Sequence, residues 1–357
     1  MAVGLPLKTT YANGDVYSAS DVNDTNGTVN LFTSSTLSRA GGKNALINGG
    51  MDIWQRGTSF AASGSNWVYT ADRWAFNRGS YATGATASRQ TTSDTTNLPF
   101  IQYGLRVQRD SGNTSTTALQ MAQTLETSSS YPFIGQNVVF SFWARRGANY
   151  SATSNIMNSY IATGTGTDQN ANTFTGYAIQ ATGTHTLTTT WQRFTVTASI
   201  PSTVTQIAVL FTETPTGTAG AADWFEITGC QLEMGSVATT FSRAGGTIQG
   251  ELAACQRYFQ KKTFGVAAAC YDSTNDYFNA VFLLSPTMRV SATLGNVTTS
   301  TVQYVNTAGS LANTTTILTS GSTSIDSAYI IPTITALGTV GQAANLVFTD
   351  ITFSAEL

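Results

Sequence analysis

The chain has 357 residues, a net charge of −2 and 10% charged residues, against about 25% in average soluble proteins. Hydrophobic residues make up 41% and aromatic residues 11%, which excludes a disordered chain. The near-neutral charge leaves no basic surface for nucleic acid or an anionic membrane, and no stretch approaches the roughly 20 apolar residues of a membrane span. Frequent Thr, Val, Tyr and Phe favour strands, so we expect a mainly β protein of more than one domain.

The first 43 residues form a short polar leader. Residues 1–10 lack the apolar core of a secretion signal. The turn signal Asn13-Gly14-Asp15 precedes a helix-capping pattern at residues 18–21. A segment this small buries too little surface to stand alone. We therefore interpret residues 1–43 as an attachment or oligomerisation segment that packs against other chains.

Residues 44–245 repeat apolar stretches between turns rich in Gly, Ser, Thr and Asn. In Arg193–Ile200 every second residue is apolar and the others are polar, which is the period of a half-buried strand. No helices alternate with these strands, so we predict an antiparallel sandwich of the jelly-roll kind. Further strands are predicted at Leu105–Gln108, Val138–Trp143, Gln206–Phe211 and Trp224–Ile227.

A helix and a second β domain complete the chain. Ile248, Leu252, Cys255 and Phe259 recur at helical spacing and predict a connecting helix over residues 246–262. Residues 263–357 are rich in Thr and alternate in hydrophobicity from Val347 to the last residue, which predicts a smaller C-terminal β-sandwich.

Several uncommon motifs recur in one family of proteins. The stretch 44–57, Asn-Ala-Leu-Ile-Asn-Gly-Gly-Met-Asp-Ile-Trp-Gln-Arg-Gly, and the stretch 69–74, Tyr-Thr-Ala-Asp-Arg-Trp, resemble the opening of carbohydrate-binding-module-like jelly rolls in phage tail fibres. Residues 228–241 resemble the closing strand of these domains, and residues 251–259 the segment that follows it. Residues 13–23 are similar to a leader of phage tail and fibre proteins, whereas 282–289 match only loosely.

This resemblance implies a homotrimeric, host-facing virion protein, assembled in the host cytoplasm and placed in a tail appendage. Its partners would be a host surface glycan and other tail or baseplate proteins, the latter bound through the leader. The family's shared Trp54, Arg56, Arg73 and Trp74 are interpreted as structural. Some relatives hold calcium where Asp52 and Glu226 stand, but two carboxylates supply too few oxygens for that ion. We expect no metal and no cofactor.

Glycan recognition requires aromatic rings that stack on sugars, together with amides and hydroxyls. Aromatic residues in loops are the best candidates, because those in strands belong to cores; Trp143 and Trp191 are assigned to the core on this ground. For each candidate, packing beneath a loop is the alternative. The candidate glycan contacts are Trp67, Tyr69, Tyr81, Tyr150 and Tyr177.

Catalysis is the main rival function. A polysaccharide depolymerase would need two carboxylates about 5–10 Å apart. Asp223 and Glu226 are close in sequence, but three residues along a strand places them on opposite faces. His185 lies in a Thr-rich stretch without a nucleophile motif, and the three cysteines are interpreted as buried apolar residues. We therefore expect a non-catalytic glycan-binding fibre protein; the alternative is a purely structural decoration, head-fibre or connector subunit.

Overall fold

The computed structural model describes residues 43–61, 67–77, 79, 84–272, 277–278, 280–295, 301–305, 311–315, 317–333 and 343–357. The predicted leader (residues 1–43) lies, except for Lys43, outside these residues. The protein is mainly β, and all pairs between the described strands are antiparallel. No helix in the described part is long and apolar enough to cross a membrane.

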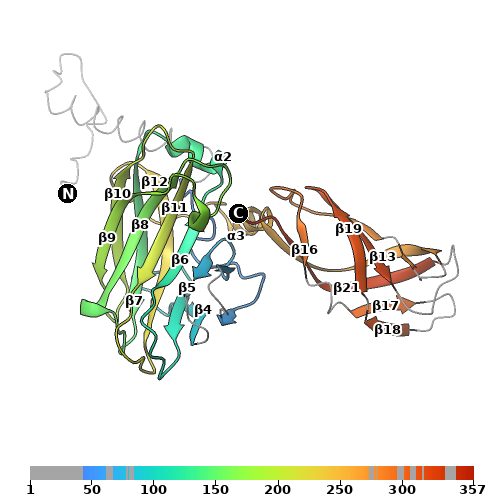
Figure 1. Ribbon diagram of the computed structural model, residues 1–357, viewed down its shortest axis with the longest axis horizontal. Coiled ribbons are helices and arrows are strands. Elements are labelled where there is room, and N and C mark those ends of the chain that lie inside the picture. Colours follow the sequence, from blue (N-terminus) through green and yellow to red (C-terminus); the bar gives the residue numbers. More distant parts are fainter. Residues whose placement is uncertain are drawn as a thin grey trace, which may run out of the picture.

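Two six-stranded sheets form the central sandwich (Figure 1). Alternation of apolar and polar residues gives each sheet one buried face. The first sheet runs β1 (Ser59–Ala61), β4 (Ala85–Thr91), β5 (Tyr103–Arg109), β12 (Trp224–Met234), β7 (Asn137–Arg146) and β10 (Gln192–Ser199). The second sheet runs β2 (Val68–Tyr69), β3 (Ala75–Asn77), β6 (Leu119–Thr124), β11 (Gln206–Glu213), β8 (Ile156–Gly164) and β9 (Ala178–Thr186).

Aromatic residues of both sheets meet in the core. The ring of Phe211 on the second sheet lies 4.7 Å from that of Phe142 and 5.4 Å from that of Phe140, both on the first sheet. Trp74 packs 6.2 Å from Phe211 and is fully buried. The predicted alternation in β10 is confirmed, because Val196 and Ala198 are buried while the residues between them are exposed.

A short helix leads from the sandwich to the C-terminal strands. Helix α3 (Ile248–Gln256) starts at Thr247, whose hydroxyl accepts from the Gly250 N–H at 3.1 Å. The helix ends before the predicted residue 262, because strand β13 begins at Phe259. Phe259 is therefore a buried residue of strand β13 and not of the helix.

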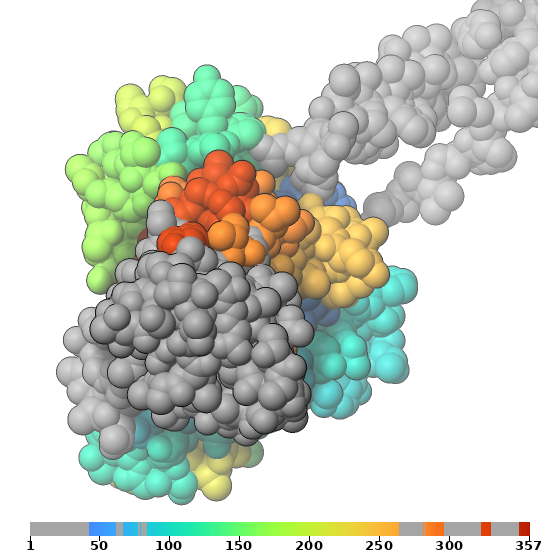
Figure 2. All heavy atoms as spheres, turned by 90° about the vertical axis from the view of Figure 1, so that its right-hand side faces the viewer, coloured from blue at the N-terminus to red at the C-terminus, as the bar shows by residue number. Residues whose placement is uncertain are grey.

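The third sheet forms the C-terminal β domain. Its strands follow one another in the order β15 (Ala280–Leu283), β20 (Ser327–Thr333), β14 (Tyr277–Phe278), β13 (Phe259–Asp272), β21 (Ala343–Ser354), β17 (Thr301–Val305) and β18 (Leu311–Thr315). Two further strands pair outside this order: β16 (Thr293–Gly295) pairs with β21, and β19 (Ile317–Thr323) pairs with β20. Figure 2 looks from the side of this domain, and its described orange and red segments lie in front of the central sandwich in that view. Short helical turns in the sandwich are α2 (Thr127–Ser130), η1 (Tyr131–Phe133), η2 (Thr153–Asn155) and η3 (Ala171–Thr173).

Buried cysteines agree with the sequence expectation where their side chains are described. Cys230 and Cys255 are free thiols with no exposed surface. Burial raises the pKa of both thiols well above the ordinary value, so they remain protonated. The side chain of Cys270 lies outside the described part of the chain.

Candidate functional site

The outer face of the second sheet is set by strict alternation along its strands. Met121, Phe211 and Ile161 point into the core and are fully buried. Their neighbours in β6, β11 and β8 therefore point away from the first sheet. Because the strands pair in a continuous register, these outward side chains line up in rows across the sheet, about 5 Å apart from strand to strand.

One row consists of amides and a hydroxyl, and we call it the amide row. Asn77 pairs with Gln120, Gln120 with Thr212, and Thr212 with Asn158. All four side chains are partly exposed. Within the described residues, the side chains of Gln120 and Asn158 make no hydrogen bond to the protein, so their donors and acceptors are open to a ligand.

The neighbouring row is apolar and ends in a tyrosine. This apolar row consists of Ala75, Ala122, Leu210 and Tyr160. Tyr160 is partly exposed and packs against the small cluster beneath it, which includes Leu210 and Phe174. Its phenol lies close enough to Tyr177 to contribute, after burial, to the raised pKa of Tyr177. Tyr177 is 46% exposed and directly precedes β9, whose first residue pairs with Thr163 of β8.

The predicted glycan contacts differ in how far their side chains are exposed to solvent. Tyr177 stands at the surface directly before β9, and Trp67 is partly buried against the cluster that includes Leu210 and Phe174. Tyr150 is only 6% exposed and donates from its hydroxyl to the Ile156 carbonyl at 3.1 Å, so it is a core residue and not a surface contact. Tyr81 lies outside the described residues.

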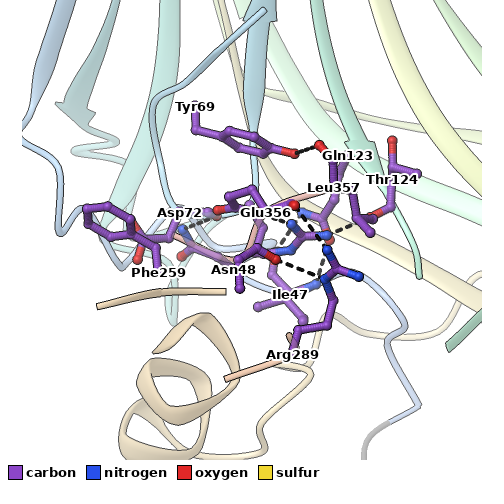
Figure 3. Close-up of polar contacts among 12 residues, drawn as sticks. Ile47, Asn48, Tyr69, Asp72, Gln123, Thr124, Phe259, Arg289, Glu356 and Leu357 are labelled. Atoms are coloured by element: carbon purple, nitrogen blue, oxygen red, sulfur yellow. Dashed lines mark hydrogen bonds and ion pairs between the residues drawn. The ribbon is translucent and has the colours of Figure 1, made fainter. Parts of the chain in front are cut away.

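Tyr69 is partly buried, because it forms part of the contact between the two domains (Figure 3). Its hydroxyl donates to the Leu357 carbonyl at 3.2 Å. The Arg56 guanidinium lies 5.3 Å from the centre of its ring. Burial, followed by the nearby Glu356 carboxylate, raises the pKa of Tyr69 to about 12. The Tyr69 hydroxyl is thus engaged in the protein, while the partly exposed side chain lines a small cavity.

Glu356 is the centre of this contact, which we call the domain junction. Its carboxylate accepts from Arg56 at 2.9 Å and pairs with Arg73, which is 2% exposed. The Arg56 and Arg73 guanidinium groups stack 3.6 Å above the rings of Phe259 and Tyr258, respectively. The arginines assigned to structural roles thus tie the central sandwich to the segment after β21.

A third arginine approaches the junction from the C-terminal domain. Arg289 donates to the carbonyls of Ala355 and Glu356 at 2.8 and 3.1 Å and to the Asp168 carboxylate at 3.0 Å (Figure 3). Asp168 belongs to the central sandwich. Hydrogen bonds and ion pairs from both domains therefore meet at the junction, and they hold the C-terminal residues against the second sheet.

The carboxylates weighed for catalysis are distributed through the fold. Asp223 is bound to Arg109 at 2.7 Å inside the sandwich, whereas Glu226 lies on the outer face of the first sheet between Arg106 and Arg145. Asp223 and Glu226 thus lie on opposite faces of the first sheet, as predicted. Asp52, considered for calcium, pairs with Arg243 at 2.8 Å. The described residues contain no cluster of three or more potential metal ligands from His, Cys, Asp and Glu.

His185 is a core residue of β9. It is 7% exposed, and its Nε2 lies 2.8 Å from the Ser159 hydroxyl. Burial lowers its pKa to about 4, so the imidazole is neutral at pH 7. Its ring packs 4.8 Å from that of Phe194 and 5.2 Å from that of Phe142. This serine–histidine contact serves packing and lies away from the surface.

Sequence reasoning missed the residues that the register brings together. Tyr160 is absent from the predicted glycan contacts, and it lies in the middle of β8. The alternation of residues 156–164 carries a signal for this strand, with Asn158 and Tyr160 on its wet face. Nothing in one sequence tells which strand becomes its neighbour, so the row from Asn77 to Asn158 could not be predicted.

No protein-family model and no curated protein sequence matches the chain. Solved structures give distant similarities. The xylan-binding domain CBM22-1 of Paenibacillus barcinonensis Xyn10C is 13% identical, with a TM-score of 0.31, 50% of this chain covered and 100% of that one. TmCBM61, solved in complex with beta-1,4-galactotriose, is 12% identical, with a TM-score of 0.31 and coverage of 54% and 99%.

A phage protein gives a similarity of the same order. The enzymatically active domain of bacteriophage CBA120 tailspike protein 4 is 12% identical, with a TM-score of 0.32, and the match covers 54% of this chain and 21% of that one. Similarities this distant leave the function to be argued from the chain's own residues.

Proposed function

We propose that the central sandwich binds a host surface glycan without cleaving it, as the receptor-binding part of a phage tail fibre. The observation that carries the proposal is the outer face of the second sheet, where the partly exposed Tyr160 lies beside the amide row. Amide and hydroxyl groups match the donors and acceptors of sugar hydroxyls. Tyrosine rings offer an apolar face for sugar C–H groups.

The dimensions of this face suit an oligosaccharide. The amide row runs from Asn77 on β3 to Asn158 on β8, across β6 and β11. Neighbouring strands lie about 4.8 Å apart, so these three steps span roughly 14 Å. This length accommodates several linked sugars, each within reach of one polar side chain. Three weak sites in a homotrimer would strengthen attachment through avidity.

The state of the carboxylates favours binding over hydrolysis. Glu226 accepts from two arginines, and Asp168 accepts from Arg289 and from the Thr127 N–H. Glu213 is 1% exposed, and burial raises its pKa well above the ordinary value. A glycosidase needs two accessible carboxyl groups on either side of a sugar bond. Glu226 and Glu213 do not meet that requirement, because both are buried.

The assignment to a phage particle is supported by the motifs around residues 44–57 and 228–241. In this proposal the protein is a homotrimer in the virion tail, and residues 1–43 bind other tail or baseplate proteins. The glycan-binding face remains directed to the host.

A glycan array and a host-cell binding assay test the proposal, using the full chain and two variants. Tyr160→Ala is expected to weaken binding about tenfold, because an aromatic contact contributes up to about 1.5 kcal/mol and 1.4 kcal/mol is a factor of ten. Tyr131→Ala is the matched control, since Tyr131 is 76% exposed but lies outside both rows. Tyr131→Ala should unfold at the wild-type temperature, and Tyr160→Ala at a lower temperature but in one folded state at the assay temperature, because Tyr160 packs against a buried cluster.

Three results would count against the proposal. Absence of binding to every glycan and host cell would favour the purely structural role. Equal binding by Tyr160→Ala and wild type would place the site elsewhere. Release of reducing sugar by the wild-type chain would contradict the non-catalytic assignment.

A further inference from the structure

A small cavity lies where the apolar row of the second sheet meets the domain junction. It measures about 120 Å³. Ala75 and Ala122 of the apolar row form part of its wall, so the cavity is continuous with the proposed glycan-binding face. Leu357 contributes a wall from the C-terminal domain. The remaining lining residues are Trp67, Tyr69, Arg73, Thr124, Asn170 and Ala171.

Two of these residues carry buried donors without an acceptor. The indole Nε1 of Trp67 and the Nε of Arg73 are buried, and neither donates a hydrogen bond within the described part of the chain. Such groups are rare in folded proteins, because an unsatisfied buried donor costs about 1–3 kcal/mol. Both line the same cavity, so a ligand that offers an acceptor there would satisfy them.

The acceptor need not be charged. The Nη1 of Arg73 already pairs with Glu356, and its Nη2 donates to the Thr124 carbonyl at 2.8 Å. The positive charge is thus compensated, and a neutral carbonyl oxygen suits the free Nε. Three alanines, Ala75, Ala122 and Ala171, supply an apolar wall that suits a methyl group. One water occupies about 30 Å³ in the liquid, so the cavity accepts a group of about four heavy atoms.

From this combination we infer that the cavity receives the acetamido group of an N-acetylated sugar. The carbonyl oxygen of that group accepts from Trp67 and Arg73, and its methyl group lies against the alanines. The rest of the sugar extends from the cavity past the partly exposed Trp67, because Ala122 and Leu210 of the apolar row are only 3% and 6% exposed. The inference rests on the proposed function, because it assigns a sugar class to one end of the same face.

Nuclear magnetic resonance on the full chain tests this directly with two simple probes. Methyl N-acetyl-β-glucosaminide and methyl β-glucoside differ only in the acetamido group, which the second replaces with a hydroxyl. At millimolar concentration the first should shift the indole N–H signal of Trp67 and receive saturation at its acetyl methyl. The second should do neither. Trp67→Phe identifies the signal by its loss.

Two substitutions probe the donors and the space separately. Trp67→Phe keeps an aromatic ring but removes the N–H, so it should weaken binding of the acetylated probe about fivefold, the value of one hydrogen bond of about 1 kcal/mol. Ala171→Leu fills the cavity and should abolish the acetyl saturation signal. Ala178→Leu is its control, because Ala178 is exposed and does not line the cavity.

The possible failures are distinguishable. If neither probe moves the Trp67 signal, or if both move it equally, the inference is overturned, whatever the glycan array shows. If the acetylated probe binds but Tyr160→Ala leaves array binding unchanged, the cavity assignment holds and the proposed face fails. A filled cavity that still binds the acetylated probe would also overturn the inference.

Discussion

Glu356→Gln should loosen the domain junction, and the structure allows the loss to be worked out. The carboxylate pairs with Arg56 and Arg73, which are 14% and 2% exposed. Removing one partner of a buried ion pair costs about 3–5 kcal/mol, because the other charge stays buried without compensation. Arg56 keeps Asp72 at 3.7 Å, so the main loss falls on Arg73. We expect the lower end, about 3 kcal/mol.

Urea unfolding followed by tryptophan fluorescence measures this loss. With a slope of about 3 kcal/mol per molar urea, the transition should move down by about 1 M. Asp350→Asn is the control, since its ion pair with Lys261 is exposed at both ends, 57% and 38%, and such pairs contribute less than about 1 kcal/mol. Equal midpoints for wild type and Glu356→Gln would refute the reasoning, as would equal shifts in the two variants.

Two other predictions concern the central sandwich. Phe211→Ala should cost about 3–5 kcal/mol, because it opens a cavity among fully buried rings, whereas Phe100→Ala, at a side chain 77% exposed, should change thermal unfolding little. Burial raises the pKa of Asp72 from 3.8 to about 6. The folded chain therefore holds a proton between about pH 4 and 6 that the unfolded chain releases, and the free energy of unfolding falls by about 3 kcal/mol as pH rises through that window. Asp72→Asn should flatten this dependence in urea titrations; parallel curves for the two proteins would contradict it.

The strands were predictable because a half-buried sheet imprints a period of two on the sequence. The alternation in 193–200 marks β10, and the apolar run 206–211 marks β11. The end of α3 was misplaced because Phe259 continues the helical spacing, although pairing with Ser354 draws it into β13 instead. Pairing over such a sequence distance leaves no local trace.

The candidate site was harder to predict for a related reason. Tyr69 has the surroundings of a surface loop, with Gly64, Ser65 and Asn66 before it, yet Leu357 and Arg56 enclose it. Tyr160 has a strand pattern and was passed over, although the outward side of that strand is open. The sequence pattern around a residue thus says little about its exposure to solvent. The C-terminal domain covers Tyr69 in β2, whereas Tyr160 in β8 of the same sheet stays partly exposed.

The domain junction and the proposed sugar cavity share Arg73 and the C-terminal residues, so their energetics should be linked. Glu356 compensates Arg73, and the next residue, Leu357, closes the cavity beside it. If Glu356→Gln releases this segment, the cavity loses a wall while Tyr160 and the amide row remain in place. The variant should then lose its preference for the acetylated probe but keep binding to glycans that contact only the sheet. The same preference in wild type and variant would mean that Leu357 only covers the cavity and does not shape it.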